Sequence, residues 1–336
     1  MIIELYTSDA VFDTLALEWN ALLGQSQSNR VFMTQEWLAA WWKAYHPGDL
    51  WVLAVRDSNH QLVGLAPWFI AHSQAGRLIH SIGCVDVTDY LEVIAKVDCE
   101  RDVFEIIAAY LAEHQADFDA LDLCNIPESA PLLRYLPDAL RQHDFTVETE
   151  FQEVCPVITL SDSWDSYLEG LSKKNRHELR RKLRRLEGDT EHVAWYVVGQ
   201  EHDLDAEIER FFALMRTASA DKVEFLQNEQ HVTFFQLMCK AILPTGWLQL
   251  AFLTVDGAYA AAYLNFDYNN DILVYNSGLD LNVGASLSPG IGLLAYLIED
   301  AISKGRQHFD FLRGNEEYKY RMGAVDTQVL KLTATH

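Results

Sequence analysis

The chain has 336 residues, of which 49% are hydrophobic and 22% are charged, and its formal net charge is −23. This composition is typical of a globular protein with two domains or one large one, and the negative charge argues against general affinity for DNA or anionic membranes. No stretch approaches 18 uninterrupted apolar residues, and the acidic N-terminus does not resemble a signal peptide. We therefore expect no membrane span and a cytoplasmic location.

Strand and helix patterns alternate along the first half. Strands are predicted at Ile2–Tyr6, Trp51–Arg56, Gln61–Ala71 and Phe118–Leu123, and helices at Asp9–Leu23, Thr34–Tyr45, Arg101–His114 and Pro131–His143. The segment Glu148–Leu160 alternates poorly, which indicates a strand with a hinge. Trp37, Trp41 and Trp42 recur at helical spacing, which favours core packing over a ligand cage.

The second half begins with helices and continues with a group of strands. Helices are predicted at Asp165–Glu187, Leu204–Thr217, Glu229–Leu243 and Pro289–Ser303, and strands at Leu248–Val255, Ala258–Asp267, Ile272–Ser277, His308–Leu312 and Gln328–Thr333. The Asp256-Gly257 pair predicts a tight hairpin turn between the first two of these strands.

The two halves resemble each other. Each contains a hairpin, then a helix, then a strand with the pattern F-D-x-L, at Phe118–Leu121 and again at Phe309–Leu312. This repeated order predicts an α+β protein made of two copies of one unit, residues 1–155 and 156–336. Each unit is expected to be a mixed, mostly antiparallel sheet flanked by helices.

Cysteine and histidine spacing argues against metal binding. The five cysteines are scattered without a C-x-x-C pair, so we expect neither a disulfide framework nor a zinc site, and a reducing compartment fits best. The twelve histidines show no H-x-x-x-H or H-E-x-x-H spacing, so the sequence predicts no metal site.

The densest charge lies in Ser172–Glu187, a predicted helix with eight Lys or Arg and one acid between Lys173 and Arg185. One side of this basic helix is apolar and is formed by Leu179, Leu183 and Leu186. The cations could simply form a solvated face. They could instead bind the phosphates of a cofactor, a carrier group or tRNA. Under this second interpretation the candidate contacts are Lys173, Arg176 and Arg180.

A second candidate is the helix start L-S-P-G-I-G-L-L. Gly290 and Gly292 would allow a ligand to approach the backbone, and the N-terminus of a helix favours a pyrophosphate. Ser288 is either part of that anion site or a plain cap before Pro289. The glycines could also serve only for packing.

A third candidate is F-D-F-L-R-G-N-E-E-Y-K-Y-R-M-G, in which a strand is followed by a polar loop. Asp310 is predicted inside an apolar strand, where a carboxylate needs a partner such as Lys319. Tyr318 and Lys319 are candidates for acid/base chemistry, and Arg313 and Glu316 for substrate contacts. A purely structural Asp–Lys or Asp–Arg pair is the alternative.

Two strand ends supply weaker candidates. Tyr275 and Asn276 end a strand just before the glycine-containing helix start, from which their side chains could face a ligand. Asp86, Asp89 and Tyr90 follow a predicted strand and are candidates for a pocket mouth.

Taken in this order, the basic helix, the S-P-G-I-G segment and the Y-K loop resemble the CelD-like (cellulose-biosynthesis-associated) branch of the GNAT acyltransferases. That branch is related to FemAB-like enzymes, which use two tandem GNAT units. The strong resemblance covers residues 156–325. It implies an acyltransferase that uses acetyl-CoA or another acyl-CoA, with Tyr318, Lys319 and Asp310 near the chemistry. Gly290 and Gly292 match the glycines of the family's pyrophosphate loop, but Leu287 stands where Gln or Arg is expected.

The resemblance leaves the donor and acceptor open. The leading hypothesis is an N-acyltransferase acting on a small-molecule or glycan-linked amine, connected with polysaccharide or cell-envelope metabolism. A FemAB-like enzyme that takes an amino acid from tRNA would make use of the basic helix. A catalytically silent binding module is the third hypothesis.

Overall fold

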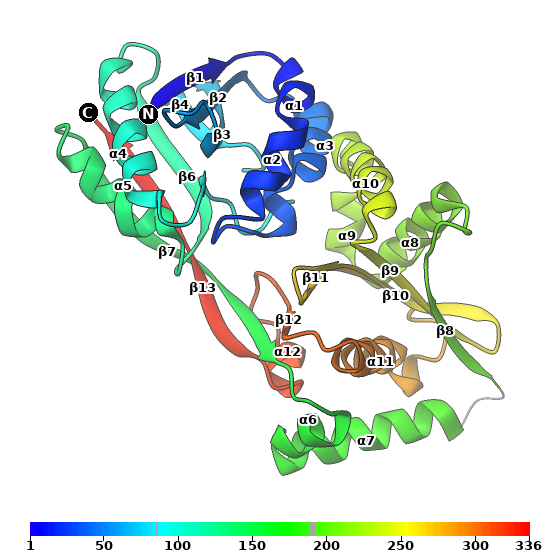
Figure 1. Ribbon diagram of the computed structural model, residues 1–336. Helices are drawn as coiled ribbons and strands as arrows, with labels where there is room; N and C mark the ends of the chain where they lie inside the picture. The colour runs from blue at the N-terminus through cyan, green and yellow to red at the C-terminus, as the bar shows by residue number, and fades with distance from the viewer. Residues whose placement is uncertain (85–86, 189–191) are drawn as a thin grey trace. The chain divides into compact units, whose positions relative to one another are not determined.

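The computed structural model describes residues 1–84, 87–188 and 192–336 (Figure 1). The chain divides into two compact units. The first consists of Met1–Glu153 together with Gln328–His336, and the second of Val154–Thr327. Each unit contains a row of paired β-strands, called its sheet below, and its own set of helices.

The sheet of the first unit has the strand order β1-β2-β3-β4-β6-β13. Its strands are β1 (Ile2–Tyr6), β2 (Asp49–Arg56), β3 (Leu62–Ser73), β4 (Gly76–Ser81), β6 (Ala120–Pro127) and β13 (Val325–Thr335), with the short β5 (Ile94–Ala95) against β3. β4 and β6 run parallel, and the other neighbours in this order run antiparallel. A parallel pair requires a long crossover, and helix α4 lies within it.

The helices of the first unit are α1 (Ala10–Thr14), α2 (Ala16–Leu23), η1 (Val31–Met33), α3 (Gln35–Tyr45), α4 (Glu100–Glu113) and α5 (Pro131–Arg141). The Thr34 side chain caps α3 by accepting a hydrogen bond from Trp37 N. Trp37, Trp41 and Trp42 are at most 2% exposed, which places all three in the core. The interpretation of these rings as packing residues is therefore confirmed.

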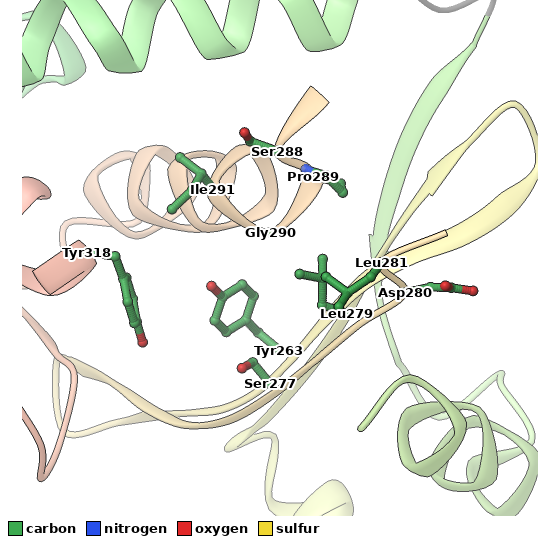
Figure 2. Close-up of a pocket in the computed structure, with 10 residues that line it drawn as sticks. All are labelled: Tyr263, Ser277, Leu279, Asp280, Leu281, Ser288, Pro289, Gly290, Ile291 and Tyr318. Atoms are coloured by element: carbon green, nitrogen blue, oxygen red, sulfur yellow. The ribbon is translucent and has the colours of Figure 1, made fainter. Parts of the chain in front are cut away.

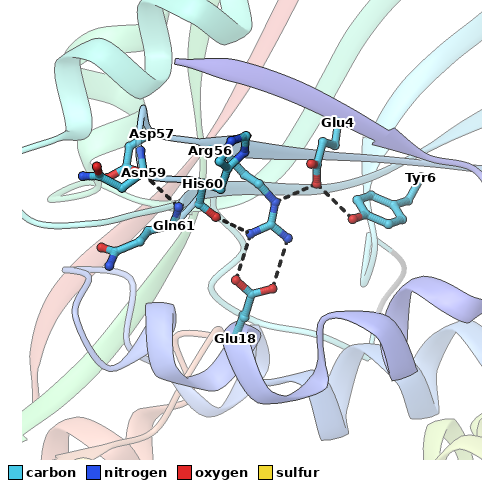
Figure 3. A network of polar contacts seen from close by, with 8 residues as sticks. All are labelled: Glu4, Tyr6, Glu18, Arg56, Asp57, Asn59, His60 and Gln61. Carbon is cyan, nitrogen blue, oxygen red and sulfur yellow. Dashed lines mark hydrogen bonds and ion pairs between the residues drawn. The ribbon is translucent and has the colours of Figure 1, made fainter.

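Arg56 links β1, β2 and α2 of the first unit through hydrogen bonds (Figure 3). Arg56, at the end of β2, donates to Glu4 of β1 at 2.7 Å and to both carboxylate oxygens of Glu18 of α2 at 2.8 and 3.0 Å. Arg56 also donates to the carbonyl of His60 in the β2–β3 turn. The guanidinium lowers the pKa of both carboxyl groups, which is the expected effect of a charge-assisted hydrogen bond.

The sheet of the second unit has the order β8-β9-β10-β11-β12-β7. Its strands are the second part of β7 (Thr146–Thr159), from Val154 on, and β8 (Val193–Val197), β9 (Leu248–Val255), β10 (Ala258–Tyr268), β11 (Asp271–Leu279) and β12 (His308–Asp310). Its helices are α6 (Trp164–Gly170), α7 (Lys173–Gly188), α8 (Leu204–Ala218), α9 (Ala220–Phe225), α10 (Glu229–Ile242), η2 (Leu243–Thr245), η3 (Ala285–Leu287), α11 (Pro289–Ser303) and α12 (Glu317–Arg321). Asp256 and Gly257 have φ of 51° and 82°, as the predicted tight β9–β10 turn requires.

The two sheets share one topology, which confirms the predicted duplication of an α+β unit. In each, an antiparallel row ends in a parallel pair, β4 with β6 or β11 with β12. A helix, α4 or α11, connects the parallel strands, and a long antiparallel strand completes the sheet. The two F-D-x-L segments lie at the beginning of β6 and at β12, which are equivalent positions in the two sheets.

Several details differ from the sequence predictions. Gln328–His336 group with the first unit rather than the second, because Val329–Thr335 pair with β6. β7 is one continuous strand without a hinge, and the prediction missed the short β5, β8 and α9, whereas β4 is the strand predicted ahead of Asp89 and Tyr90. Cys84 and Cys124 form a disulfide, so the expectation that the cysteines stay unpaired is wrong for these two.

We predict that Gly278→Ala lowers the free energy of unfolding by about 1–3 kcal/mol. Gly278 lies on the face of β11 that packs on α8, where an added Cβ would be 2.6 Å from Leu214 Cβ and 2.9 Å from the Leu214 backbone. Urea denaturation measures the change. Gly170→Ala is the control, since its Cβ would meet nothing within 4 Å, and an equal loss in both variants would contradict this account.

Candidate functional site

The central feature of the second unit is the early separation of β11 and β12. They pair only at Asp271–His308, Ile272–Phe309 and Leu273–Asp310. Beyond this point the chain after β12 stays with β7, because Phe311 N and Gly314 N donate to the carbonyls of Pro156 and Val154. The remainder of β11 instead follows β10. The two strands therefore diverge and open a space beside the second half of β11.

A pocket of about 350 Å³ lies at this divergence (Figure 2). Its walls come from β10, β11, the following loop, the first turn of α11 and α12. The lining residues are Tyr263, Ser277, Leu279, Asp280, Leu281, Ser288, Pro289, Gly290, Ile291 and Tyr318. The pocket is thus largely apolar, with a few hydroxyl groups and the N-terminus of a helix at its edge.

Gly290 and Gly292, at the start of α11, have different surroundings. Ser288 adopts a left-handed conformation with φ of 57°, and no capping hydrogen bond from its side chain is recorded in the described part of the chain. Gly290 lines the pocket, and an added Cβ would make only an ordinary contact of 3.6 Å with Leu279. Gly292 faces α7 instead, where a Cβ would lie 2.3 Å from Leu186. Gly290 is therefore open to a ligand, whereas Gly292 allows close helix packing.

Two tyrosines face this pocket. Tyr318 begins α12 and packs edge-on against Phe311, and Tyr263 lies on β10 opposite Ser277. Burial raises the pKa of both phenols, so their hydroxyl groups remain protonated at neutral pH. Each hydroxyl can therefore donate a hydrogen bond to a group in the pocket.

Lys319 is buried beneath the loop after β12 and is only 2% exposed. Its Nζ donates to the carbonyl oxygens of Arg313 at 2.8 Å and Gly314 at 2.9 Å, and it pairs with Glu316 at 2.8 Å. These contacts fix the loop, because a buried ammonium binds three acceptors at fixed positions. Among the predicted site residues, Lys319, Arg313 and Glu316 are thus brought together by the Lys319 ammonium.

Asp310 is 5% exposed and accepts a hydrogen bond from Leu312 N at 2.7 Å. Leu312 has a φ of 56°, a conformation that a leucine rarely adopts. The Asp310 carboxylate therefore stabilises the turn by which the chain leaves β11.

The predicted strand-end residues of β11 lie apart from the pocket lining. The β10–β11 register shifts between Leu264 and Asn265, and Tyr275 packs against Phe235 and Phe266. The Asn276 side chain accepts a hydrogen bond from Ser277 N. The pocket receives the next residues along the strand, Ser277 and Leu279.

The basic helix, α7, packs on α11 through its predicted apolar side, with Leu179 and Leu186 buried. Arg180 and Lys173 are exposed, and Arg176 donates to the carbonyl of Glu169. At 1.5 Å per residue, Lys173 lies roughly 20 Å along the helix from Leu186, the residue that touches Gly292. The structure therefore places Lys173 far from the pocket-lining Gly290.

The sequence analysis missed a lysine beside the pocket. Lys222 of α9 donates from Nζ to the carbonyl and to the hydroxyl of Ser277, the latter at 3.1 Å. Burial lowers the pKa of Lys222 to about 8, although the charge of Glu316 acts in the opposite direction. Its sequence context, S-A-D-K-V-E-F, is that of an ordinary surface helix, so no sequence signal could have identified it.

The remaining sequence candidates lie in the first unit. Asp86 lies outside the described residues, whereas Asp89 and Tyr90 are buried. Within residues 1–84, 87–188 and 192–336, no group of three metal-ligating side chains could hold a metal ion. No helix of these same ranges is long and apolar enough to cross a membrane.

Comparison with known proteins identifies the class of this site. The family model described as an acetyltransferase (GNAT) domain matches residues 173–320. The pocket, α11 and α12 up to Tyr320 thus lie within the residues that this family model matches. No curated protein matches the chain.

Solved structures extend the similarity to the whole chain. FemX has a TM-score of 0.67 and 11% identity, with 98% of this chain and 97% of that chain covered. L-PGS from Bacillus licheniformis has a TM-score of 0.56 and 12% identity over 95% and 91% of the chains. A tandem GNAT protein from the clavulanic acid biosynthesis pathway has a TM-score of 0.50 and 12% identity over 98% of each. Residues 173–320 therefore match a GNAT domain, and the whole chain shares its fold with FemX and with a tandem GNAT protein.

We predict that Lys319→Met lowers the free energy of unfolding by about 2 kcal/mol, because it leaves buried carbonyl oxygens of the loop without their donor. Thermal or urea denaturation measures the change. Arg321→Met on the same helix is the matched control, since Arg321 pairs only with the exposed Glu317 among its recorded contacts and should cost less than about 1 kcal/mol. Equal stability of the two variants would show that Lys319 does not hold the loop.

Proposed function

We propose that the chain is an N-acyltransferase that moves an acyl group, such as acetyl, from coenzyme A to an amine. The observation that supports this most is the pocket where β11 leaves β12, inside the GNAT domain and at the N-terminus of α11. The acceptor is a small-molecule or glycan-linked amine. A place in polysaccharide or cell-envelope metabolism is part of this proposal.

The pocket residues suit the thioester end of the donor. Leu279, Leu281 and Ile291 offer apolar contacts to the acyl group and its thioester arm. The backbone at Gly290 is open to the pocket, and a helix N-terminus attracts negative charge. Leu287 is 9% exposed and packs in the core, so it does not replace the polar residue that the family resemblance implies for the pyrophosphate. The pocket lining therefore fits the thioester arm of coenzyme A better than its nucleotide.

The chemistry requires proton transfers but no covalent intermediate. The amine nitrogen bonds to the thioester carbon, the carbon–sulfur bond breaks, and the amine loses one proton while the sulfur gains one. Tyr318, whose hydroxyl stays protonated, is the donor that we assign to the leaving thiolate. Positioned proton transfer of this kind contributes about 10²–10⁴-fold to a rate.

Tyr318→Phe should lower kcat by about 10²-fold and leave the folded state stable, because it removes only the phenol oxygen. Release of free thiol from acetyl-CoA in the presence of an amine measures the rate. Tyr320→Phe removes the same atom from the same helix, outside the described pocket lining, and should retain the wild-type rate. Full activity of Tyr318→Phe would eliminate this role.

Gly290→Leu should weaken acetyl-CoA binding at least tenfold, since its side chain would extend into the pocket. Titration calorimetry measures the affinity. Gly188→Leu, at the end of α7, is the control because its Cβ would meet nothing within 4 Å. Equal acetyl-CoA affinity of both variants would place the donor elsewhere.

An aminoacyl-tRNA donor is the second candidate function, and the exposed cations of α7 favour it. Arg180, Arg181, Arg184 and Arg185 are all exposed on this helix. Filter retention of tRNA at low and high salt tests this candidate, because phosphate contacts make binding fall steeply with salt. Salt-independent or absent retention would exclude it.

A further inference from the structure

The half-buried Lys222 beside the pocket suggests a second half of the catalytic machinery. Tyr318 can supply a proton, but the proposed reaction also needs a group that removes one from the attacking amine. Asp310 is a buried acid in the same chain segment as Tyr318, but it accepts a hydrogen bond from Leu312 N in the turn after β12. Asp280 lines the pocket, but its Oδ1 accepts hydrogen bonds from Asn282 N and Nδ2, and its side chain points away from Tyr263 and Tyr318 in Figure 2. Lys222 reaches the pocket through Ser277, which lines it.

Ser277 connects Lys222 with the pocket. Its hydroxyl lies 3.1 Å from Lys222 Nζ, and in Figure 2 its side chain points toward the space beside Tyr263 and Tyr318. Ser277 also pairs with Tyr263 across the β10–β11 ladder, which fixes its face of the sheet. One hydroxyl group thus touches both the amine on α9 and the pocket.

We propose that Ser277 and Lys222 form a proton relay that accepts the proton of the attacking amine. This inference rests on the proposed acyl transfer. As the amine nitrogen bonds to the thioester carbon, its proton passes to Ser277 Oγ, and the Ser277 hydroxyl proton passes to the neutral Lys222 Nζ. The leaving sulfur takes a proton from Tyr318, the Lys222 ammonium returns one to solvent, and Tyr318 regains one from solvent, so that both side chains are restored. The sum is amine plus acyl thioester giving amide plus free thiol.

The charges around Lys222 determine the pH range in which the relay works. Desolvation lowers its pKa to about 8, so the neutral amine is a minor fraction at pH 7 and dominates above pH 8. Glu316, from the loop before α12, favours the ammonium, but it is shared with Lys319. Asp221 and Glu224 on α9 itself are exposed, and Ser277 on β11 does not titrate in this range. Activity should therefore rise with pH up to about 8 and then level off.

The test uses the full chain with acetyl-CoA and hydroxylamine, a small nucleophile that is already neutral above pH 7. Hydroxamate formation is followed from pH 6.5 to 9.5. We expect Lys222→Met to lower kcat by about 10²-fold and to remove the rise toward pH 8. Ser277→Ala should do the same, and Ser277→Thr, which restores the hydroxyl, should recover most of the rate. Lys240→Met, at an exposed Lys–Asp pair on α10, is the matched control.

Lys222→Arg separates the relay from a merely structural contact. A guanidinium can still donate to the Ser277 carbonyl but does not lose its proton, so the relay predicts the same loss as in Lys222→Met. Recovery of the rate and the pH profile by Lys222→Arg would overturn the relay, and so would unchanged profiles in Lys222→Met. Absence of hydroxamate and of acetyl-CoA binding in the wild type would instead overturn the proposed function, and the relay with it.

Discussion

Three residue pairs join β11 to β12, and the pocket exists because the pairing stops there. If the two strands paired along their full length, the backbone of Ser277 would be covered by its neighbour strand. Asp310 ends the pairing by holding the unusual conformation of Leu312, and Lys319 holds the loop that follows. The polar groups of the F-D-F-L-R-G-N-E-E-Y-K segment therefore serve mainly to keep the sheet open, and this opening places Tyr318 at the pocket.

Two lysines of the same unit, the buried Lys319 and the half-buried Lys222, have opposite roles. Lys319 has carbonyl acceptors and a carboxylate around its ammonium, and it acts as a structural cation. Lys222 Nζ donates to the carbonyl and the hydroxyl of Ser277, and desolvation lowers the pKa of this lysine. Desolvation that acceptors do not offset favours the neutral amine, which lets a lysine exchange protons closer to neutral pH. The hydrogen-bond acceptors around each Nζ thus distinguish the structural Lys319 from the proton-exchanging Lys222.

The sequence predicted the elements whose signals are local. The Asp256-Gly257 turn, the helix Pro289–Ser303 and the two F-D-x-L strands follow from turn chemistry, capping and repetition, and all of them occur in the structure. The short strand β8 and the loop-spanning contacts of Lys319 depend on tertiary partners, which leave no periodic signal. Lys222 could not be found for the same reason: its burial comes from β11, which is distant in sequence. Gly290 and Gly292 look equivalent in the sequence, and only packing on Leu186 distinguishes them.

Hydrogen–deuterium exchange with and without acetyl-CoA directly tests the claim that the acyl donor binds in the opening beside β11. The account predicts slower exchange of backbone amides in Ser277–Leu281 and at the start of α11, because these segments line the pocket. Exchange elsewhere in the second unit, including the N-terminal half of α7, should change little. Protection confined to α7, with no change at Ser277–Leu281, would contradict the account.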